Sequence, residues 1–194
     1  MYITIFDLDI RNKQIVHSIM RRYELHRDIQ SMFHSTREAK NVLYRIIERD
    51  RGYRLYIYSS DRADIKSAKS GMKYIGDAVM PDIIKKFGNR CGIDMLVVPT
   101  KKTNGKVRGI NNRSERLNWI KRKASENGFT FCECEECGKE TLKVNQHSGQ
   151  MIFDIYAYEY RGEIEIYNIE KFKYCVEHGL GRFKAYGAGL VMLR

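Results

Sequence analysis

Two side chains that can exchange protons stand close together near the start of the chain. Tyr23 and His26 are three residues apart, and apolar residues recur at helical spacing through residues 21–33. Residues three apart on a helix face the same side, so the phenol and the imidazole are presented together, with Arg22 and Arg27 as neighbours. Because an imidazole titrates near neutral pH, the pair predicts general acid or base chemistry. The alternative is an ordinary exposed histidine on a helix.

A glycine-rich segment lies near the other end of the sequence. Within residues 178–190 its glycines and the two cations between them are Gly179, Gly181, Gly187, Gly189, Arg182 and Lys184. Glycine permits positive φ angles and a close approach of backbone N–H groups, which is the geometry of an anion-binding nest. The segment follows a predicted helix and precedes a predicted strand, an order that fits neither a Walker A loop nor a dinucleotide-binding loop. We therefore expect a loop that approaches an anion, with ordinary turns as the alternative.

Positive charge is concentrated in one stretch of the chain. The 194 residues include 35 Lys and Arg against 24 Asp and Glu, which gives a formal charge of +11. Residues 101–123 hold nine of these cations against the single acid Glu115, a local charge of +8. The nine are Lys101, Lys102, Lys106, Arg108, Arg113, Arg116, Lys121, Arg122 and Lys123. Such a stretch favours contact with phosphates over a merely solvated helix face, and places nucleic acid first among the partners.

Two other groups of residues could bind a metal ion. The first consists of Cys132, Cys134, Cys137 and His147, which could supply three thiolates and an imidazole to zinc. It forms only one cysteine cluster, and glutamates interleave it. In the second, Asp7 and Asp9 alternate on a predicted strand and could hold Mg²⁺, but no third acid completes the site. We favour a site without metal over both.

The elements that must position these residues alternate between strands and helices. We expect, in chain order, a strand at 2–10, a helix at 21–33, a hairpin of 41–48 with 53–59, a strand at 93–98, a helix at 113–127, short strands at 129–134 and 141–144, a hairpin of 151–160 with 163–167 that turns at Arg161 and Gly162, a helix at 169–177 and a strand at 190–193. Residues 62–87 carry only a weak helical pattern. The aromatic run Phe153, Tyr156, Tyr158 and Tyr160 is expected to pack in a sheet rather than to stack on bases.

This order predicts an α+β fold with two successive βαββαβ cycles. Two cycles correspond to tandem ferredoxin-like (RRM/RAMP-like) domains, which we assign to residues 1–90 and 91–194. The N-terminal domain then carries the helix with Tyr23 and His26, and the C-terminal domain carries the basic stretch and the glycine-rich loop.

The composition is that of a folded intracellular protein. Hydrophobic residues make up 43% and the chain has only 2 Pro, which argues against a disordered tail protein. Five cysteines, three of them within six residues, do not suggest a secreted disulfide framework. The first ten residues include two Asp and lack the pattern of a signal peptide or a membrane span. We expect a cytoplasmic location and no membrane partner.

Three features taken together resemble one known family. They are residues 23–33, the glycine-rich residues 179–181 and 183–190, and the intervening basic helix with Trp119. In this combination the sequence resembles the CasE family of CRISPR repeat-processing endoribonucleases, which belong to the type I-E Cascade complex. The resemblance extends over essentially the whole chain, and its most specific part is the conjunction of the helical histidine with the glycine-rich loop.

The resemblance implies that the protein cuts a hairpin repeat RNA with no metal or other cofactor, leaving a 2′,3′-cyclic phosphate and a 5′-hydroxyl. It implies that His26 is the catalytic histidine and Tyr23 an active-site tyrosine, without deciding which proton each handles. The expected RNA-binding residues are Arg22, Arg27, Lys101, Lys102, Lys106, Arg108, Arg113, Arg116, Arg182 and Lys184. The implied partners are a CRISPR repeat RNA hairpin and the subunits of a Cascade-type complex. The alternatives are a non-catalytic RNA-binding subunit and a zinc-dependent RNA module.

Overall fold

The computed structural model describes residues 1–33, 41–50, 52–145 and 152–194. Its elements are β1 (Tyr2–Leu8), α1 (Lys13–Met20), α2 (Arg22–Gln30), β2 (Leu43–Arg49), β3 (Gly52–Ser59), the 3₁₀ helix η1 (Ile65–Ser67), β4 (Met72–Val79), α3 (Ile83–Phe87), β5 (Arg90–Val97), β6 (Thr100–Thr103), β7 (Lys106–Gly109), α4 (Arg113–Glu126), β8 (Phe129–Phe131), β9 (Glu135–Asn145), β10 (Ile152–Ile166), α5 (Ile169–His178), the 3₁₀ helix η2 (Lys184–Tyr186) and β11 (Val191–Leu193).

The chain divides into two compact units, and neither is one continuous stretch of sequence. The first unit comprises Met1–Met80, Leu142–Asp154 and Lys184–Gly187. The second unit comprises Pro81–Thr141, Ile155–Phe183 and Ala188–Arg194. The glycine-rich segment is therefore shared between them, with η2 in the first unit.

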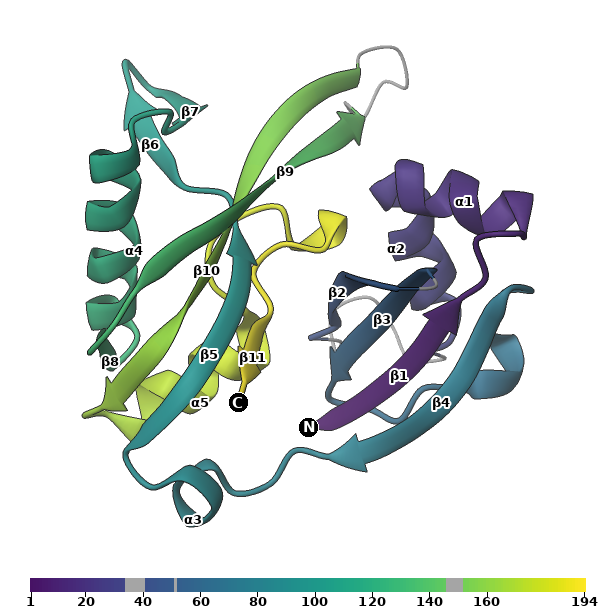
Figure 1. Ribbon diagram of the computed structural model, residues 1–194, viewed down its shortest axis with the longest axis horizontal. Helices are drawn as coiled ribbons and strands as arrows, with labels where there is room; N and C mark the ends of the chain where they lie inside the picture. Colours follow the sequence, from purple (N-terminus) through teal and green to yellow (C-terminus); the bar gives the residue numbers. More distant parts are fainter. Residues whose placement is uncertain (34–40, 51, 146–151) are drawn as a thin grey trace. The chain divides into compact units, whose positions relative to one another are not determined.

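The first unit is an antiparallel sheet in the order β2-β3-β1-β4, with α1 and α2 on one of its faces (Figure 1). Alternation along β1 turns Phe6 and Leu8 toward the helices, and Phe6 is opposite Leu55 of β3. α2 buries Leu25 and Ile29 in the same core. Because its apolar side is fixed in this way, the opposite side of α2 is available for other residues.

Three features of the first unit differ from the predicted elements. The helix predicted at residues 21–33 is α2, and a further helix, α1, precedes it after Asn12, whose side chain accepts hydrogen bonds from two backbone N–H groups. Between β3 and β4 the chain forms only η1, so the second helix of the βαββαβ unit is reduced to a single 3₁₀ turn. The first strand ends at Leu8, earlier than expected.

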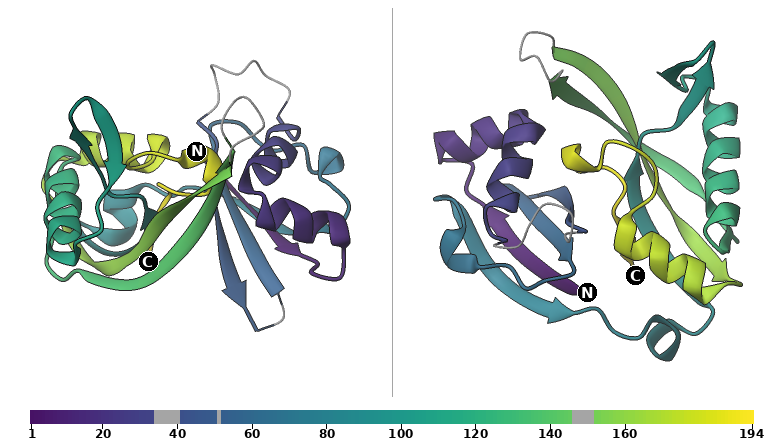
Figure 2. Two further views of the ribbon diagram at one scale, coloured as in Figure 1. Left: turned by 90° about the horizontal axis from the view of Figure 1, so that it is seen from above. Right: turned by 180° about the vertical axis from the view of Figure 1, so that it is seen from behind.

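The second unit repeats the same strand arrangement in the order β11-β5-β10-β8, with β9 paired to β10 (Figure 2). Its first, second, third and fourth equivalent strands are β5, β8, β10 and β11, so the order matches β4-β1-β3-β2 of the first unit. α5 packs Phe172 against Phe129 of β8, with ring centroids 5.2 Å apart. The predicted α+β fold of tandem ferredoxin-like domains is confirmed by these two sheets.

The hairpin predicted to turn at Arg161 and Gly162 is wrong. β10 runs without a break from Ile152 to Ile166, and these two residues pair with Asp94 and Ile93 of β5. A Cβ at Gly162 would lie 1.9 Å from the carbonyl oxygen of Glu133. Glycine is needed there because another backbone approaches closely, and not because the chain turns.

The aromatic run on β10 is only partly in the core. Tyr158 and Tyr160 are buried, as predicted, but Phe153 and Tyr156 are 42% and 44% exposed. The ammonium of Lys139 lies 3.7 Å from the centroid of the Tyr156 ring. The prediction of a core position is therefore wrong for the first two aromatic residues of the run.

Among the helices that fall within the described ranges, none has the length and apolar character needed to cross a bilayer.

Candidate functional site

α2 presents Tyr23 and His26 from adjacent turns, and His26 is also three residues before the buried Ile29, so its ring lies at the margin of the buried side of the helix. Both side chains are half-buried, whereas Leu25 and Ile29 are fully buried. The His26 ring is stacked near Tyr44 of β2, with centroids 6.3 Å apart and 24° between the planes, and its Nδ1 atom is shielded from solvent. The imidazole therefore rests against an aromatic wall provided by the sheet.

The structure brings part of the glycine-rich segment to the same place. η2 lies beside α2 in the first unit, although more than 150 residues separate them in sequence (Figure 1). The rings of Tyr186 and Tyr23 are 6.4 Å apart. The Tyr44 hydroxyl lies 3.0 Å from the carbonyl oxygens of both Arg22 and Ala185. Residues 184–187 and the Tyr23/His26 pair thus share one neighbourhood.

The four glycines of this segment have backbone angles that favour glycine. Their φ angles are +72° at Gly179, +86° at Gly181, +84° at Gly187 and +91° at Gly189. The N–H groups of Gly179, Gly187 and Gly189 donate to the carbonyl oxygens of Cys175, Lys184 and Leu96. These three amides are engaged within the fold, so the glycines here shape the path of the loop rather than present a continuous nest of N–H groups.

Four of the predicted RNA-binding cations lie on one small hairpin of the second unit. β6 and β7 form a two-stranded antiparallel sheet with Asn104 and Gly105 at the turn, both at positive φ. Its exposed cations are Lys101, Lys102, Lys106 and Arg108. Lys101 forms an ion pair with Glu115 of α4 at 2.5 Å. Arg113, the first residue of α4, is also exposed.

Arg116 differs from these cations because it lies in the interior. Its side chain is 8% exposed, and its guanidinium donates to both carboxylate oxygens of Glu136 at 2.8 and 2.6 Å. It also lies 3.8 Å from the centroid of the Tyr158 ring. The hydrogen bond from Arg116 is the main reason why the pKa of Glu136 is lowered. The Tyr160 hydroxyl donates to the same carboxylate, and burial is the main reason why the pKa of Tyr160 is raised. The contacts of Arg116 favour a role in holding α4 to β9.

The remaining predicted cations are divided between the units. Arg22 and Arg27 lie on α2 of the first unit, where Arg22 is half-buried and Arg27 forms an exposed ion pair with Glu24 at 3.4 Å. Lys184 is half-buried in η2, whereas Arg182 is exposed and belongs to the second unit.

The predicted alternatives that involve metals receive no geometric support from the described residues. Asp7 is bound by Arg54 through two hydrogen bonds of 2.7 and 3.1 Å, a pairing that lowers the pKa of Asp7, and Asp9 pairs with Arg11 at 3.1 Å. All five cysteines are free thiols, and burial raises the pKa of Cys134 to about 11. No three His, Cys, Asp or Glu side chains of the described part of the chain are grouped as metal ligands. His147, the fourth residue of the zinc hypothesis, lies outside the described residues.

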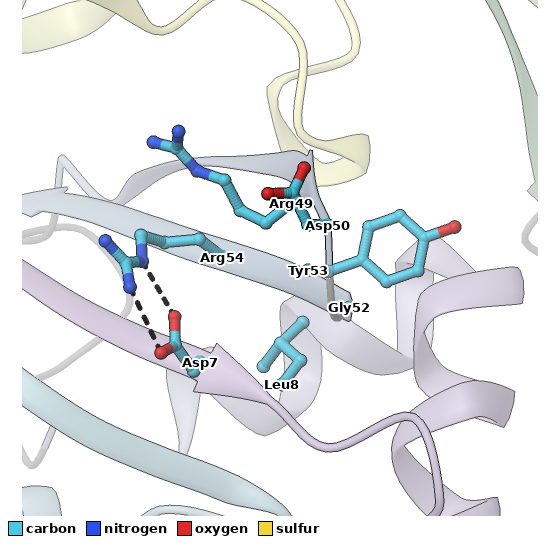
Figure 3. Close-up of a pocket in the computed structure, with 7 residues that line it drawn as sticks. All are labelled: Asp7, Leu8, Arg49, Asp50, Gly52, Tyr53 and Arg54. Carbon is cyan, nitrogen blue, oxygen red and sulfur yellow. Dashed lines mark hydrogen bonds and ion pairs between the residues drawn. The ribbon is translucent and has the colours of Figure 1, made fainter.

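A cavity of about 390 Å³ opens at one end of the first sheet (Figure 3). It is lined by Asp7, Leu8, Arg49, Asp50, Gly52, Tyr53 and Arg54. Figure 3 shows Arg54 bound to Asp7 by two contacts. The lining does not include Tyr23, His26 or η2, and its two arginines are balanced by two aspartates. This cavity is therefore distinct from the site on α2.

Tyr44 is the residue of this neighbourhood that the sequence did not single out. It stood within a predicted strand, as one apolar residue among several. Its partners at Arg22 and Ala185 are 22 and 141 residues away, so no local pattern could have marked it.

Known structures resemble this fold over its whole length. The "CRISPR endoribonuclease Cse3 bound to 19 nt RNA" is similar with a TM-score of 0.90 and 19% identity, covering 100% of both chains. Cse3 of Thermus thermophilus bound to an RNA representing a pre-cleavage complex is similar with a TM-score of 0.89 and 19% identity, covering 100% of this chain and 98% of that chain. The CRISPR-associated protein Cas6e of Escherichia coli K-12 is similar with a TM-score of 0.75 and 15% identity, covering 100% of this chain and 98% of that chain.

These likenesses establish the fold, and no curated protein matches the chain. The family assignment comes from the sequence as a whole. Residues 1–194 match the family described as "CRISPR associated protein", and the chain therefore belongs to that family.

Proposed function

We propose that this protein is a metal-independent endoribonuclease that cuts the hairpin of a CRISPR repeat RNA. The observation that carries the proposal is the packing of η2 against α2, beside Tyr23 and His26. Membership of the CRISPR-associated family and a fold shared with Cse3, a CRISPR endoribonuclease whose structure contains RNA, support it. The runner-up, a non-catalytic subunit that only holds RNA, requires the same fold but no acid or base at this position.

The proposed reaction uses a nucleophile supplied by the RNA. The ribose 2′-oxygen loses its proton and attacks the adjacent phosphorus, and the bond from phosphorus to the 5′-oxygen of the next nucleotide breaks. That 5′-oxygen takes up a proton, so the products are a 2′,3′-cyclic phosphate and a 5′-hydroxyl. The protein must align three atoms, move two protons and stabilise the extra charge on the phosphoryl oxygens.

His26 is assigned the role of general acid or base, and Tyr23 that of its partner in the site. An imidazole can both give and accept a proton near neutral pH, which suits either of the two proton transfers. The two side chains are presented from adjacent turns of α2, and the ring of Tyr186 extends the same surface. Arg22, which precedes Tyr23 in α2, and Lys184, which belongs to η2 together with Tyr186, are assigned to the scissile phosphate.

The exposed cations of the second unit are assigned to the stem of the hairpin. A-form RNA is recognised mainly through phosphates, 2′-hydroxyls and shape, which suits a set of lysines and arginines without strict geometry. Lys101, Lys102, Lys106 and Arg108 of the β6–β7 hairpin, with Arg113 and Arg182, form this set. Arg27 completes the set from α2. Arg116 contributes by holding α4, which carries Arg113, to β9.

We further propose that the protein works within a larger ribonucleoprotein. Similar chains occur in structures described as a CRISPR RNA-guided surveillance complex, at a TM-score of 0.74 and 18% identity. Residues 1–90 would supply the cleavage helix and residues 91–194 most of the RNA-binding surface. Five free thiols suit the reducing conditions of the cytoplasm, where we place this activity.

The proposal is tested by incubating candidate CRISPR repeat hairpins with the protein in EDTA and mapping both product ends. A single cut with a cyclic phosphate and a 5′-hydroxyl supports the nuclease. Tight binding without any cut, for every hairpin tried, contradicts the reaction and leaves the RNA-holding subunit. A cut that requires added metal contradicts the mechanism.

A further inference from the structure

Tyr44 is a buried tyrosine at the centre of the contacts between α2 and the Lys184–Gly187 segment. We propose that it is a positioning residue of the cleavage site, which fixes this C-terminal segment against the helix that carries His26. The inference rests on the proposed function, because it concerns the geometry of that site. Tyr44 does not take part in proton transfer in this account; it acts through the backbone of its neighbours.

The hydroxyl of Tyr44 joins two segments that are far apart in sequence. It lies 3.0 Å from the carbonyl oxygen of Arg22, the first residue of α2, and 3.0 Å from that of Ala185 in η2. One O–H group is thus shared between two backbone acceptors. Tyr44 is 0% exposed, and a buried hydroxyl without an acceptor is costly, so both segments are held close to it.

The ring of Tyr44 also contacts both segments, namely His26 of α2 and Gly187 after η2. Its plane is 24° from that of His26, with the centroids 6.3 Å apart, so the orientation of the imidazole depends on it. On the other segment, a Cβ added at Gly187 would come within 3.0 Å of the ring atom Cε2. Only glycine permits this approach, and the N–H of Gly187 closes the η2 turn by donating to Lys184.

The site needs a residue that holds these two segments together because they come from opposite ends of the chain. Tyr44 and Ala185 are separated by 141 residues, and η2 is a single 3₁₀ turn with little structure of its own. Tyr44 is anchored in β2 and is 0% exposed, so it is a rigid reference point. Placement of η2 relative to His26 is therefore set by the sheet.

The test uses Tyr44→Phe, which keeps the ring and removes only the shared hydroxyl. We expect the single-turnover cleavage rate constant to fall by at least about tenfold, because misplacement of catalytic groups is costly in rate. The dissociation constant for the uncut hairpin should change by less than about twofold, because the hydroxyl faces protein carbonyls and not the ligand. Amide hydrogen exchange at residues 184–187 should become faster.

Ser59→Ala is the matched control. Ser59 is also 0% exposed and in the first unit, and its hydroxyl donates to the carbonyl oxygen of Asp61 at 2.8 Å. This variant loses a buried hydroxyl without touching α2 or η2, so its cleavage rate and its exchange at 184–187 should match those of the wild type. All proteins are compared below their melting temperatures.

The outcomes separate this inference from the proposed function. If the wild type cuts and Tyr44→Phe cuts at the same rate, or loses rate only as much as Ser59→Ala, the positioning role is refuted. If amide exchange at 184–187 is unchanged in Tyr44→Phe, the tie to η2 is refuted, whatever the RNA result. If the wild type cuts no hairpin, the proposed function fails, while the exchange experiment still decides whether Tyr44 holds η2.

Discussion

Replacing Gly187 by alanine should destabilise the protein through two separate costs. The φ angle at this position is +84°, where an L-residue with a Cβ is strained. The added Cβ would also lie 3.0 Å from Cε2 of Tyr44, whereas ordinary contacts are 3.4–4 Å. Tyr44 is 0% exposed, so its ring has little space into which it could move.

The first cost can be measured alone with Gly88→Ala. Gly88 has a φ of +68°, but a Cβ added there meets nothing within 4 Å. Backbone strain should cost about 1–2 kcal/mol at either position. Overpacking against a buried ring adds about 1–3 kcal/mol at Gly187 only. We therefore expect a total loss of about 2–5 kcal/mol for Gly187→Ala, against about 1–2 kcal/mol for Gly88→Ala.

Urea unfolding and thermal melting of the two variants and the wild type provide the assay. For a chain of this size each kcal/mol lowers the melting temperature by about 2–4 °C, so the difference between the variants is measurable. If the two variants lose the same free energy of unfolding, the reasoning is refuted, because the contact between the added Cβ at Gly187 and Tyr44 would then have no energetic cost. A larger loss in Gly88→Ala would refute it as well.

Two further predictions concern the second unit. The hydrogen bond from Arg116 lowers the pKa of Glu136 below the ordinary value of a glutamate. This pair therefore stabilises the fold above that ordinary pKa, and the contribution is lost as the pH falls through the lowered pKa. Glu136→Gln should lower the free energy of unfolding by about 3–5 kcal/mol at pH 7, as measured by urea unfolding. The variant should also lose less stability than the wild type as the pH falls from about 5 to about 3. An equally steep loss of stability in the variant would contradict this. Lys102→Ala and Arg108→Ala should each reduce the slope of log K against log salt for hairpin binding by about one, and a slope that stays the same would show that these cations do not contact phosphate.

The order of elements was predictable because it depends on local periodicity. β-branched and aromatic runs marked β2, β3 and β5, and helical spacing with a terminal glycine marked α4. The βαββαβ arrangement followed from that order, even though η1 replaces one helix. The Asn-Gly pair at 104 and 105 is a strong hairpin signal, although only the charge of that stretch entered its prediction.

Roles that depend on distant contacts could not be predicted from local patterns. Gly162 is a residue type common in turns, which led to the predicted hairpin, but glycine is required there because the backbone of Glu133 lies close to it. Arg116 belongs to a basic run, yet its burial depends on Glu136 and Tyr158, which follow on later strands. In each case the residue type was informative and its partner was not visible in the sequence.

The candidate site was predicted in part for the same reason. Tyr23 and His26 could be placed on one side of a helix from their spacing alone. No local pattern places residues 184–187 beside them, since the tertiary fold brings these segments together. Tyr44, which contacts both segments, carried no signal of its own.

The most direct test of the account is the single-turnover cleavage rate of His26→Ala on a repeat hairpin in EDTA. His17→Ala is the matched control, because His17 is an exposed histidine on the neighbouring helix α1. Loss of a positioned acid or base should lower the rate about 10²–10⁴-fold while hairpin binding is retained, and the control should cut at the wild-type rate. Undiminished cleavage by His26→Ala would contradict the central claim that this imidazole moves a proton in the reaction.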